Sequence, residues 1–272
     1  MASEKKQMKN QIFLTPFFLD ELVPELEALI KPIWRVNKPS LPEGDTKARM
    51  SAAHEAIAGF VFDTLAAGLR PVSIAGDCCS ALGMLAGLQR AKLNPTLVWF
   101  DAHGDFNTME TTPSGFLGGM PLAMIVGKGD LALPAAIGLD PLPENQVILT
   151  DGRDLDPGER ELIVNSGVVH LADPADLLDY PLPGGPFYVH FDVDVVSLEE
   201  SPAQNYPAEG GPSASLLRAV FRRLARTEWI AAVSVSSWTR TVKAKSSVCP
   251  CWRPLSGKTS RDVSSRSAGG LR

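Results

Sequence analysis

The chain has 272 residues, of which 44% are hydrophobic and 21% charged, a composition typical of a folded, soluble domain and not of a disordered or fibrous protein. The net charge of −5 disfavours a nucleic-acid partner, because domains that bind nucleic acid usually carry a basic excess. No apolar run approaches the about 20 residues of a membrane helix, and the N-terminus lacks a signal-peptide pattern, so we expect no membrane association and a cytoplasmic location.

Apolar, β-rich runs alternate with amphipathic stretches between residues 11 and 237, which predicts βαβ units. Several runs are continuously apolar, as expected of strands covered on both faces. The predicted strands are Gln11–Leu14, Pro71–Ala75, Thr96–Phe100, Gln146–Leu149, Val168–Leu171, Pro186–Phe191 and Trp229–Val235. The predicted helices are Leu19–Leu29, Thr46–Leu69, Ser80–Ala91, Gly158–Ser166 and Ser213–Ala225. Residues 1–239 are therefore predicted to form a single α/β domain, a mostly parallel sheet with helices on both faces.

The last 33 residues differ from the rest of the chain. Residues 240–272 are rich in Ser and contain eight Lys or Arg and one acid, a net charge of +7, so the preceding 239 residues carry −12. A segment with this composition and no periodicity buries too little apolar surface to offset its ordering entropy. Two interpretations stay open: a flexible basic tail, or a departure from the native reading frame near Thr239.

Acidic motifs follow three of the predicted strands. Residues 76–80 read Gly-Asp-Cys-Cys-Ser, residues 101–105 read Asp-Ala-His-Gly-Asp, and residues 192–194 read Asp-Val-Asp. Ligands of open parallel sheets bind outside the carboxyl ends of the strands, so the three loops are expected to converge. Carboxylates gathered in one crevice repel one another unless cations neutralise them. If the Asp-x-His-x-Asp segment is extended, its alternate side chains point to one side, as a metal site requires.

Other features have simpler interpretations. A single Asp at a strand end is commonly a helix cap or turn former, but clusters ending two apolar strands favour a site. Cys79 is interpreted as a buried structural thiol, and His54 as a surface or boundary residue. Cys249-Pro250-Cys251 is too short to define a zinc site. The two close cysteine pairs are typical of cytosolic thiols and not of an extracellular disulfide framework.

The three motifs, in this order, resemble those of the arginase and agmatinase (ureohydrolase) family, whose signatures run GGDHS, DAHxD and SFDxDxxDP. The likeness continues in residues 111–115 and 153–159 and covers about residues 71–238. It implies an arginase-like fold and two Mn²⁺ ions per chain, with Asp101 and Asp192 bridging them. The implied remaining ligands are Cys78 and Asp105 for one ion, and His103 and Asp194 for the other.

The same resemblance implies hydrolysis of an arginine-like substrate by a metal-bridging hydroxide that attacks the guanidine carbon. Asp105 is then expected to hydrogen-bond that hydroxide as the catalytic residue. The amino-acid end of the substrate is expected to be held by Asn107, Ser114, Asp156 and Glu159.

Three positions depart from the family pattern. Cys78 stands where the family has a metal-binding His, Gly118 where arginase has a proton-shuttling His, and Ser237 where arginase has a Glu that pairs with the guanidinium. These departures favour a neutral N-hydroxyguanidine over a charged guanidine. They resemble the branch of the family that cleaves Nω-hydroxy-L-arginine to hydroxyurea and L-ornithine in D-cycloserine biosynthesis.

Alternative functions are an ordinary arginase or agmatinase and a catalytically silent arginine-binding homologue. Retention of all six candidate ligands, one in altered form, argues against a silent protein. A monomer is expected, because residues 240–272 contain nothing that resembles the C-terminal segment through which arginases associate.

Overall fold

The central sheet has eight strands, all parallel, within residues 8–238, which are the residues that the computed structural model describes. The strand order is β4-β1-β5-β10-β9-β6-β7-β8. Their bounds are β1 Asn10–Thr15, β4 Arg35–Val36, β5 Arg70–Ala75, β6 Thr96–Asp101, β7 Val147–Asp151, β8 Val169–Leu171, β9 Phe187–Asp192 and β10 Ile230–Ser236. The predicted α/β class and parallel sheet are confirmed, and all seven predicted strands are present.

Seven α-helices and four short 3₁₀ helices connect these strands within the described residues. The α-helices are α1 Pro24–Glu27, α2 Thr46–Ala66, α3 Ser80–Arg90, α4 Pro121–Ile125, α5 Ala132–Ala136, α6 Pro157–Val164 and α7 Ala214–Arg226. The 3₁₀ helices are η1 Leu117–Gly119, η2 Glu144–Gln146, η3 Pro174–Leu178 and η4 Val193–Val195. The longer helices begin at side-chain caps: Asp45 accepts from the Ala48 N–H at the start of α2, and Ser213 from the Leu216 N–H at the start of α7.

The predicted helix Leu19–Leu29 is wrong. Residues 17–22 form a small antiparallel hairpin of β2 (Phe17–Phe18) and β3 (Glu21–Leu22), and only the four-residue α1 follows it. Pro24 is the first residue of α1, as its missing N–H and fixed φ favour, and it restricts Val23 to the extended conformation. Proline therefore starts this helix instead of lying inside it.

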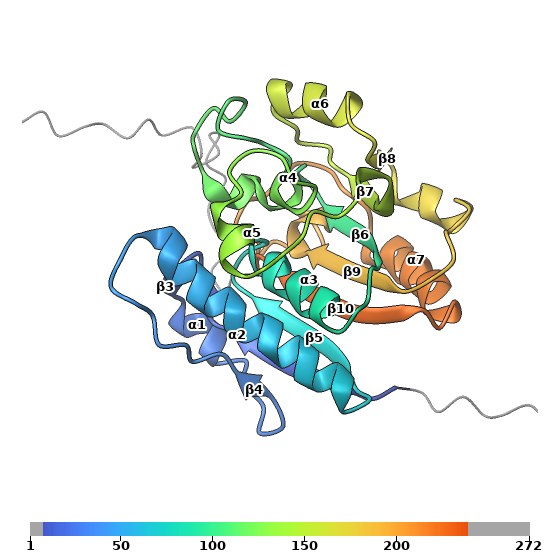
Figure 1. Cartoon of the computed structure of the whole chain (residues 1–272). Coiled ribbons are helices and arrows are strands. Elements are labelled where there is room, and N and C mark those ends of the chain that lie inside the picture. Colours follow the sequence, from blue (N-terminus) through green and yellow to red (C-terminus); the bar gives the residue numbers. More distant parts are fainter. Residues whose placement is uncertain (1–7, 239–272) are drawn as a thin grey trace, which may run out of the picture.

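Helices cover both faces of the sheet (Figure 1). Alternate residues of β6 belong to two apolar clusters: Leu97 and Trp99 pack with α2 and α3, whereas Val98 and Phe100 pack with α7. This alternation produces the continuously apolar strands seen in the sequence.

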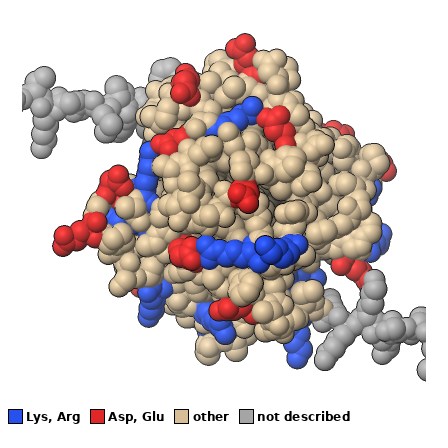
Figure 2. All heavy atoms as spheres, in the orientation of Figure 1, with Lys and Arg blue, Asp and Glu red and all other residues tan. Residues whose placement is uncertain are grey.

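The surface in Figure 2 carries Lys and Arg side chains interspersed with Asp and Glu, without a broad basic area on the described part of this face. No helix within residues 8–238 is long and apolar enough to cross a membrane. Residues 239–272, which include the basic tail and Cys249-Pro250-Cys251, lie outside the described residues.

Four neighbouring strands at the centre of the sheet, β5, β10, β9 and β6, carry the candidate site at their carboxyl ends. Cys78 follows β5, Asp101 ends β6, Asp192 ends β9 and Ser237 follows β10. The strand order thus brings together four segments that lie up to about 160 residues apart in the sequence.

Candidate metal centre and active site

Cys78 and Asp192 lie against each other in the lining of a cavity at the carboxyl ends of these strands. The Cys78 Sγ is 2.7 Å from Asp192 Oδ2 and 3.8 Å from Asp101 Oδ2, and all three residues are buried. Burial raises the pKa of the Cys78 thiol well above its usual value, and the negative charges of Asp192, Asp105 and Asp101 raise it further. Without a cation the sulfur is therefore a thiol, and a bound cation would favour the thiolate.

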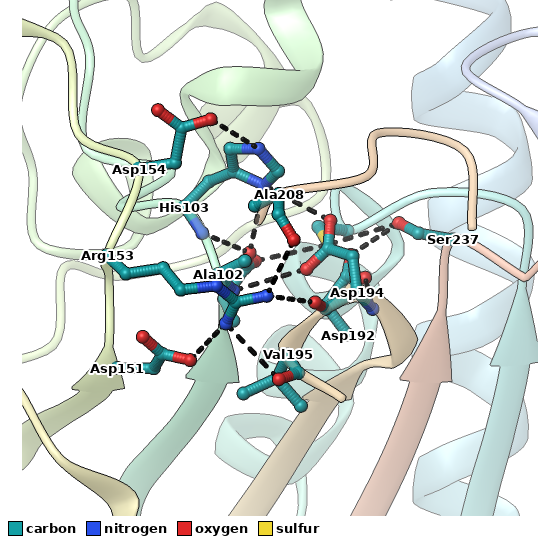
Figure 3. Close-up of polar contacts among 12 residues, drawn as sticks. Ala102, His103, Asp151, Arg153, Asp154, Asp192, Asp194, Val195, Ala208 and Ser237 are labelled. Atoms are coloured by element: carbon teal, nitrogen blue, oxygen red, sulfur yellow. Dashed lines mark hydrogen bonds and ion pairs between the residues drawn. The ribbon is translucent and has the colours of Figure 1, made fainter. Parts of the chain in front are cut away.

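A second group gathers around His103. Its Nδ1 lies 3.1 Å from Asp194 Oδ2 and 3.4 Å from Asp101 Oδ1, while its Nε2 lies 3.8 Å from Asp154 Oδ2 at the rim (Figure 3). Burial lowers the pKa of His103, but the Asp194 and Asp101 carboxylates outweigh it and hold the pKa well above its usual value. Asp101 therefore takes part in both groups, as a ligand shared by two ions would.

Asp105 supplies the strongest indication of a cation-binding site. Its Oδ2 is buried and has no hydrogen-bond partner, a costly arrangement for a carboxylate. Burial raises the pKa of Asp105 well above its usual value, and the charges of Asp101 and Asp192 raise it further. An unpartnered carboxylate oxygen amid other carboxylates fits a metal site, since carboxylates are the hard ligands that Mn²⁺ prefers.

The backbone of residues 101–105 does not have the extended conformation that was expected from the sequence. β6 ends at Asp101, the chain then bends, and Asp105 has a φ of 50°. Asp194 likewise lies in η4, two residues past the end of β9. The predicted alternation of side chains along a strand is therefore wrong here. Loop hydrogen bonds fix the ligands instead, such as that from the Asp194 N–H to Asp192 Oδ1 at 2.9 Å.

Arg153 joins the loops next to the His103 group (Figure 3). Its guanidinium pairs with the Asp151 carboxylate at the end of β7 and donates to the Asp194 carbonyl at 2.8 Å and the Val195 carbonyl at 3.2 Å. It also donates to the Glu209 carbonyl at 2.9 Å. Because these carbonyls belong to the Asp194 loop and its neighbour, Arg153 fixes the position of that loop relative to β7.

The residues expected to hold the amino-acid end line the same cavity of about 150 Å³. Asn107 Nδ2 donates to Asp156 Oδ2 at 2.9 Å, and Ser114 Oγ accepts from the Phe116 N–H at 3.2 Å. Glu159 also lines the cavity, but its two oxygens accept from the Phe106 N–H at 2.8 Å and the Asp156 N–H at 3.2 Å. These bonds tie the start of α6 to the loop after β6.

An aromatic cluster of Phe18, Phe116 and Tyr206 lines another part of the cavity. The Phe116 ring stacks on Phe18 at 6.1 Å and contacts Tyr206 at 5.5 Å, centroid to centroid. A Cβ atom at Gly118 would lie 2.3 Å from the Phe116 ring. The ring thus occupies the space that a side chain at position 118 would need.

Comparison with known proteins identifies the family. The arginase family model matches residues 36–236, which is most of the chain. The chain belongs to the arginase family.

Individual arginase-family relatives agree with this assignment. An arginase of Bacillus subtilis is 37% identical over 156 residues, 53% of this chain and 52% of the relative. An N(omega)-hydroxy-L-arginine amidinohydrolase of Streptomyces lavendulae is 35% identical over 196 residues, 70% of this chain and 66% of the relative. The chain thus spans about half to two thirds of the length of these curated relatives. The solved arginase of Bacillus caldovelox shares the fold, with a TM-score of 0.73 at 22% identity over 88% of this chain and 93% of that one.

The three departures from the arginase pattern have distinct surroundings. Cys78 lies among the candidate ligands, as predicted. At position 118 the Phe116 ring fills the space, and at position 237 the Ser hydroxyl donates to Asp192 Oδ2. Ser237 has a φ of 63°, so the chain turns sharply at the end of β10 to bring this hydroxyl to the cavity.

Sequence reasoning missed His190 and the bonding role of Arg153, and it placed His54 wrongly. His190 is buried in β9, close to Cys78 and Asp101, but it stands inside an apolar run that reads as a core strand. His54 is 2% exposed within α2 and is not a surface residue; burial lowers its pKa to about 4. The interpretation of Cys79 as a buried thiol is confirmed.

Proposed function

We propose that the chain hydrolyses Nω-hydroxy-L-arginine to hydroxyurea and L-ornithine. The observation that carries the proposal is the pair of changes at positions 118 and 237, where the chain offers an aromatic wall and a hydroxyl in place of the His and Glu expected of arginase. The similarity to an N(omega)-hydroxy-L-arginine amidinohydrolase supports it. The sequence resemblance implies that the reaction belongs to D-cycloserine biosynthesis, and we propose that it takes place in the cytoplasm.

The candidate centre has the donors for two divalent cations, for which we propose Mn²⁺. The proposed ligands fall into two sets that share Asp101 and Asp192: one contains Cys78 and Asp105, the other His103 and Asp194. A bound metal pair supplies Lewis acidity and can lower the pKa of water from 15.7 to about 7, which provides a nucleophile at neutral pH. The excess of carboxylates favours Mn²⁺, although one thiolate raises the relative affinity for softer ions.

Asp105 is proposed to orient the attacking oxygen. Asp105 lines the cavity, and its carboxylate has two oxygens, so one can bind an ion while the other accepts a hydrogen bond. Water adds its oxygen to the guanidine carbon, the bond from that carbon to the side-chain nitrogen breaks, and that nitrogen takes up a proton to become the ornithine amine. We assign the transfer of this proton to Asp105, which lines the cavity, because position 118 has no side chain that could take the role of the arginase His.

The amino-acid end of the substrate is proposed to lie against the loops at residues 107–114 and 154–159. Asn107 and Ser114 offer hydrogen bonds to an α-carboxylate, whereas Asp156 offers a charge partner for an α-amino group. Glu159 is placed to support this subsite by holding Asp156 and Phe106 through their N–H groups. Agmatine lacks the carboxylate, so these residues disfavour it.

The other end of the cavity favours a weakly basic group. An N-hydroxyguanidine is largely neutral near pH 7 and needs no buried counter-charge. A charged guanidinium without its expected partner would bear a cost of about 3–5 kcal/mol, the penalty for breaking a buried ion pair. The Ser237 hydroxyl, already committed to Asp192, does not supply that charge.

The test is product identification. Manganese-loaded protein is incubated separately with Nω-hydroxy-L-arginine, L-arginine and agmatine, and ornithine, putrescine, urea and hydroxyurea are measured. We expect hydroxyurea and ornithine in equal amounts from the first substrate. Urea formed equally fast from arginine would indicate an ordinary arginase, putrescine an agmatinase, and binding without any product a silent homologue. The control is Asp105→Asn, in which an amide nitrogen replaces one carboxylate oxygen of Asp105, and this variant is expected to form no product.

A further inference from the structure

His190 lies next to the candidate metal centre, and no role proposed so far uses it. It stands two residues before Asp192 on β9, so both side chains point to the same face of the sheet. One ring nitrogen of His190, the Cys78 sulfur and one Asp101 oxygen all lie within 4.8 Å of one another. The three residues are buried.

Hydrogen bonds and packing fix the orientation of the imidazole. Its Nδ1 lies 2.7 Å from Ser234 Oγ, which in turn lies 2.7 Å from the Tyr188 hydroxyl. The ring stacks on Trp99 with centroids 3.8 Å apart, and the Trp99 indole N–H donates to Asp101 Oδ2 at 3.1 Å. The same tryptophan therefore positions both His190 and Asp101.

The other ring nitrogen faces the cluster. Nε2 lies 3.3 Å from Ser236 Oγ, and that hydroxyl is 3.1 Å from Cys78 Sγ. A histidine that binds a metal through one nitrogen almost always donates its other N–H to a neighbouring oxygen. In the tautomer with its proton on Nδ1, the ring donates to Ser234 Oγ and keeps the Nε2 lone pair on the side of the cluster, which meets this requirement.

We propose that His190 is a ligand of the Cys78 ion, through Nε2. It supplies from β9 the imidazole nitrogen that the loop after β5 lacks because position 78 is a cysteine. Each of the two ions then has one nitrogen ligand, from His190 and from His103. A donor set of sulfur, nitrogen and carboxylate oxygen shifts the preference of this one ion towards Co²⁺ and Zn²⁺.

The test uses Co²⁺ as the probe, because a proton on a coordinated imidazole shows a strong paramagnetic shift in the NMR spectrum. The chain has four histidines, at 54, 103, 170 and 190. The unmodified protein loaded with two Co²⁺ is expected to show two shifted, exchangeable imidazole N–H signals. One such signal, or none, in protein that holds two ions would overturn the proposal without any variant.

His190→Asn gives the second readout. The Asn amide can still donate to Ser234 but has no atom at the Nε2 position. The variant therefore removes the metal ligand and keeps the hydrogen bond to Ser234. We expect loss of one shifted signal and a weakening of one of the two Co²⁺ affinities by at least about tenfold in calorimetric titration. His54→Gln is the control, expected to keep both signals. Unchanged affinities and two signals in His190→Asn would refute the role of His190.

This inference rests on the metal centre of the proposed function, and the two fail differently. Protein that binds no Co²⁺ would refute both. Protein that binds two ions through a single imidazole would refute only the role of His190.

Discussion

Placing a side chain at position 118 tests how the aromatic cluster shapes the cavity. An ideal Cβ at Gly118 would lie 2.3 Å from Cε1 and 2.4 Å from Cζ of Phe116. Carbon atoms in contact sit about 3.5–4.0 Å apart, so the ring must move by more than about 1 Å. Phe18, which stacks on this ring, and Tyr206, which contacts it at a tilt, resist that movement.

Two opposed effects determine how Gly118→Ala changes the free energy of unfolding. Gly118 does not have a positive φ in the left-handed range, so an alanine there reduces the entropy of the unfolded chain and stabilises by about 0.4–1 kcal/mol. The overlap with Phe116 costs about 1–3 kcal/mol, near the lower end because the ring is only half-buried. Gly118→Ala is therefore expected to lower the free energy of unfolding by less than about 1 kcal/mol in the native background and to raise it beside Phe116→Ala.

The assay is urea unfolding of the metal-free protein and of the two single variants and the double variant. The cycle should give a coupling energy of about 1–3 kcal/mol. Gly119→Ala is the matched control, since a Cβ there meets nothing within 4 Å, and it should show no coupling to Phe116→Ala. Additivity within about 0.5 kcal/mol for Gly118→Ala would show that the Phe116 ring does not occupy this space.

The same geometry changes the design of a restored arginase site. Gly118→His needs Phe116→Ala before its imidazole can enter the cavity. Only with that change, together with Ser237→Glu, is the preference for the hydroxylated substrate expected to narrow.

Three further predictions concern the scaffold. Gly87→Ala is expected to lower the free energy of unfolding by about 1–3 kcal/mol in chemical denaturation, because its Cβ would lie 2.5 Å from Val61 Cβ of α2, whereas Gly59→Ala on α2 meets nothing and should stabilise. The depressed pKa of His54, about 4, keeps it neutral in the native state, so its contribution to stability is fully present above pH 6.5 and is lost as pH falls towards 4. The decrease in the free energy of unfolding between pH 7 and pH 4.5 should therefore be about 2 kcal/mol smaller in His54→Gln than in the unmodified protein. An equal decrease in both proteins would contradict the lowered pKa of His54. Arg153→Lys is expected to weaken Mn²⁺ binding about 10–100-fold in calorimetric titration, because a lysine ammonium cannot donate to the Asp194 and Val195 carbonyls at the same time, as the guanidinium does. An unchanged Mn²⁺ affinity would exclude this positioning role of Arg153.

The sequence predicted the fold well where apolar runs are long. All seven predicted strands form, since a strand buried on both faces needs a continuous run of apolar residues and leaves a strong signal. The two-residue β4 leaves no such signal. The prediction failed around Pro24 because the apolar spacing of residues 19–29 suits a helix, while the proline prevents a helix from running through residues 19–23.

The site residues were predictable where they belong to short motifs that follow predicted strands. Cys78, Asp101 and Asp192 all lie where that rule puts them, at neighbouring strands of the sheet. His190 was missed because it lies inside an apolar run, although its spacing of two residues from Asp192 places both side chains on the same face of β9. The position of Phe116 against Gly118 depends on a ring orientation that only the folded loop determines.

The measurement that tests the central claim most directly is the ratio of kcat/KM for Nω-hydroxy-L-arginine and L-arginine with saturating Mn²⁺. A deficit of about 3–5 kcal/mol for the charged guanidinium corresponds to two to four orders of magnitude. We therefore predict that the hydroxylated substrate is cleaved at least about a hundredfold more efficiently. Equal values for the two substrates would contradict the assignment of Gly118 and Ser237 as the positions that set substrate choice.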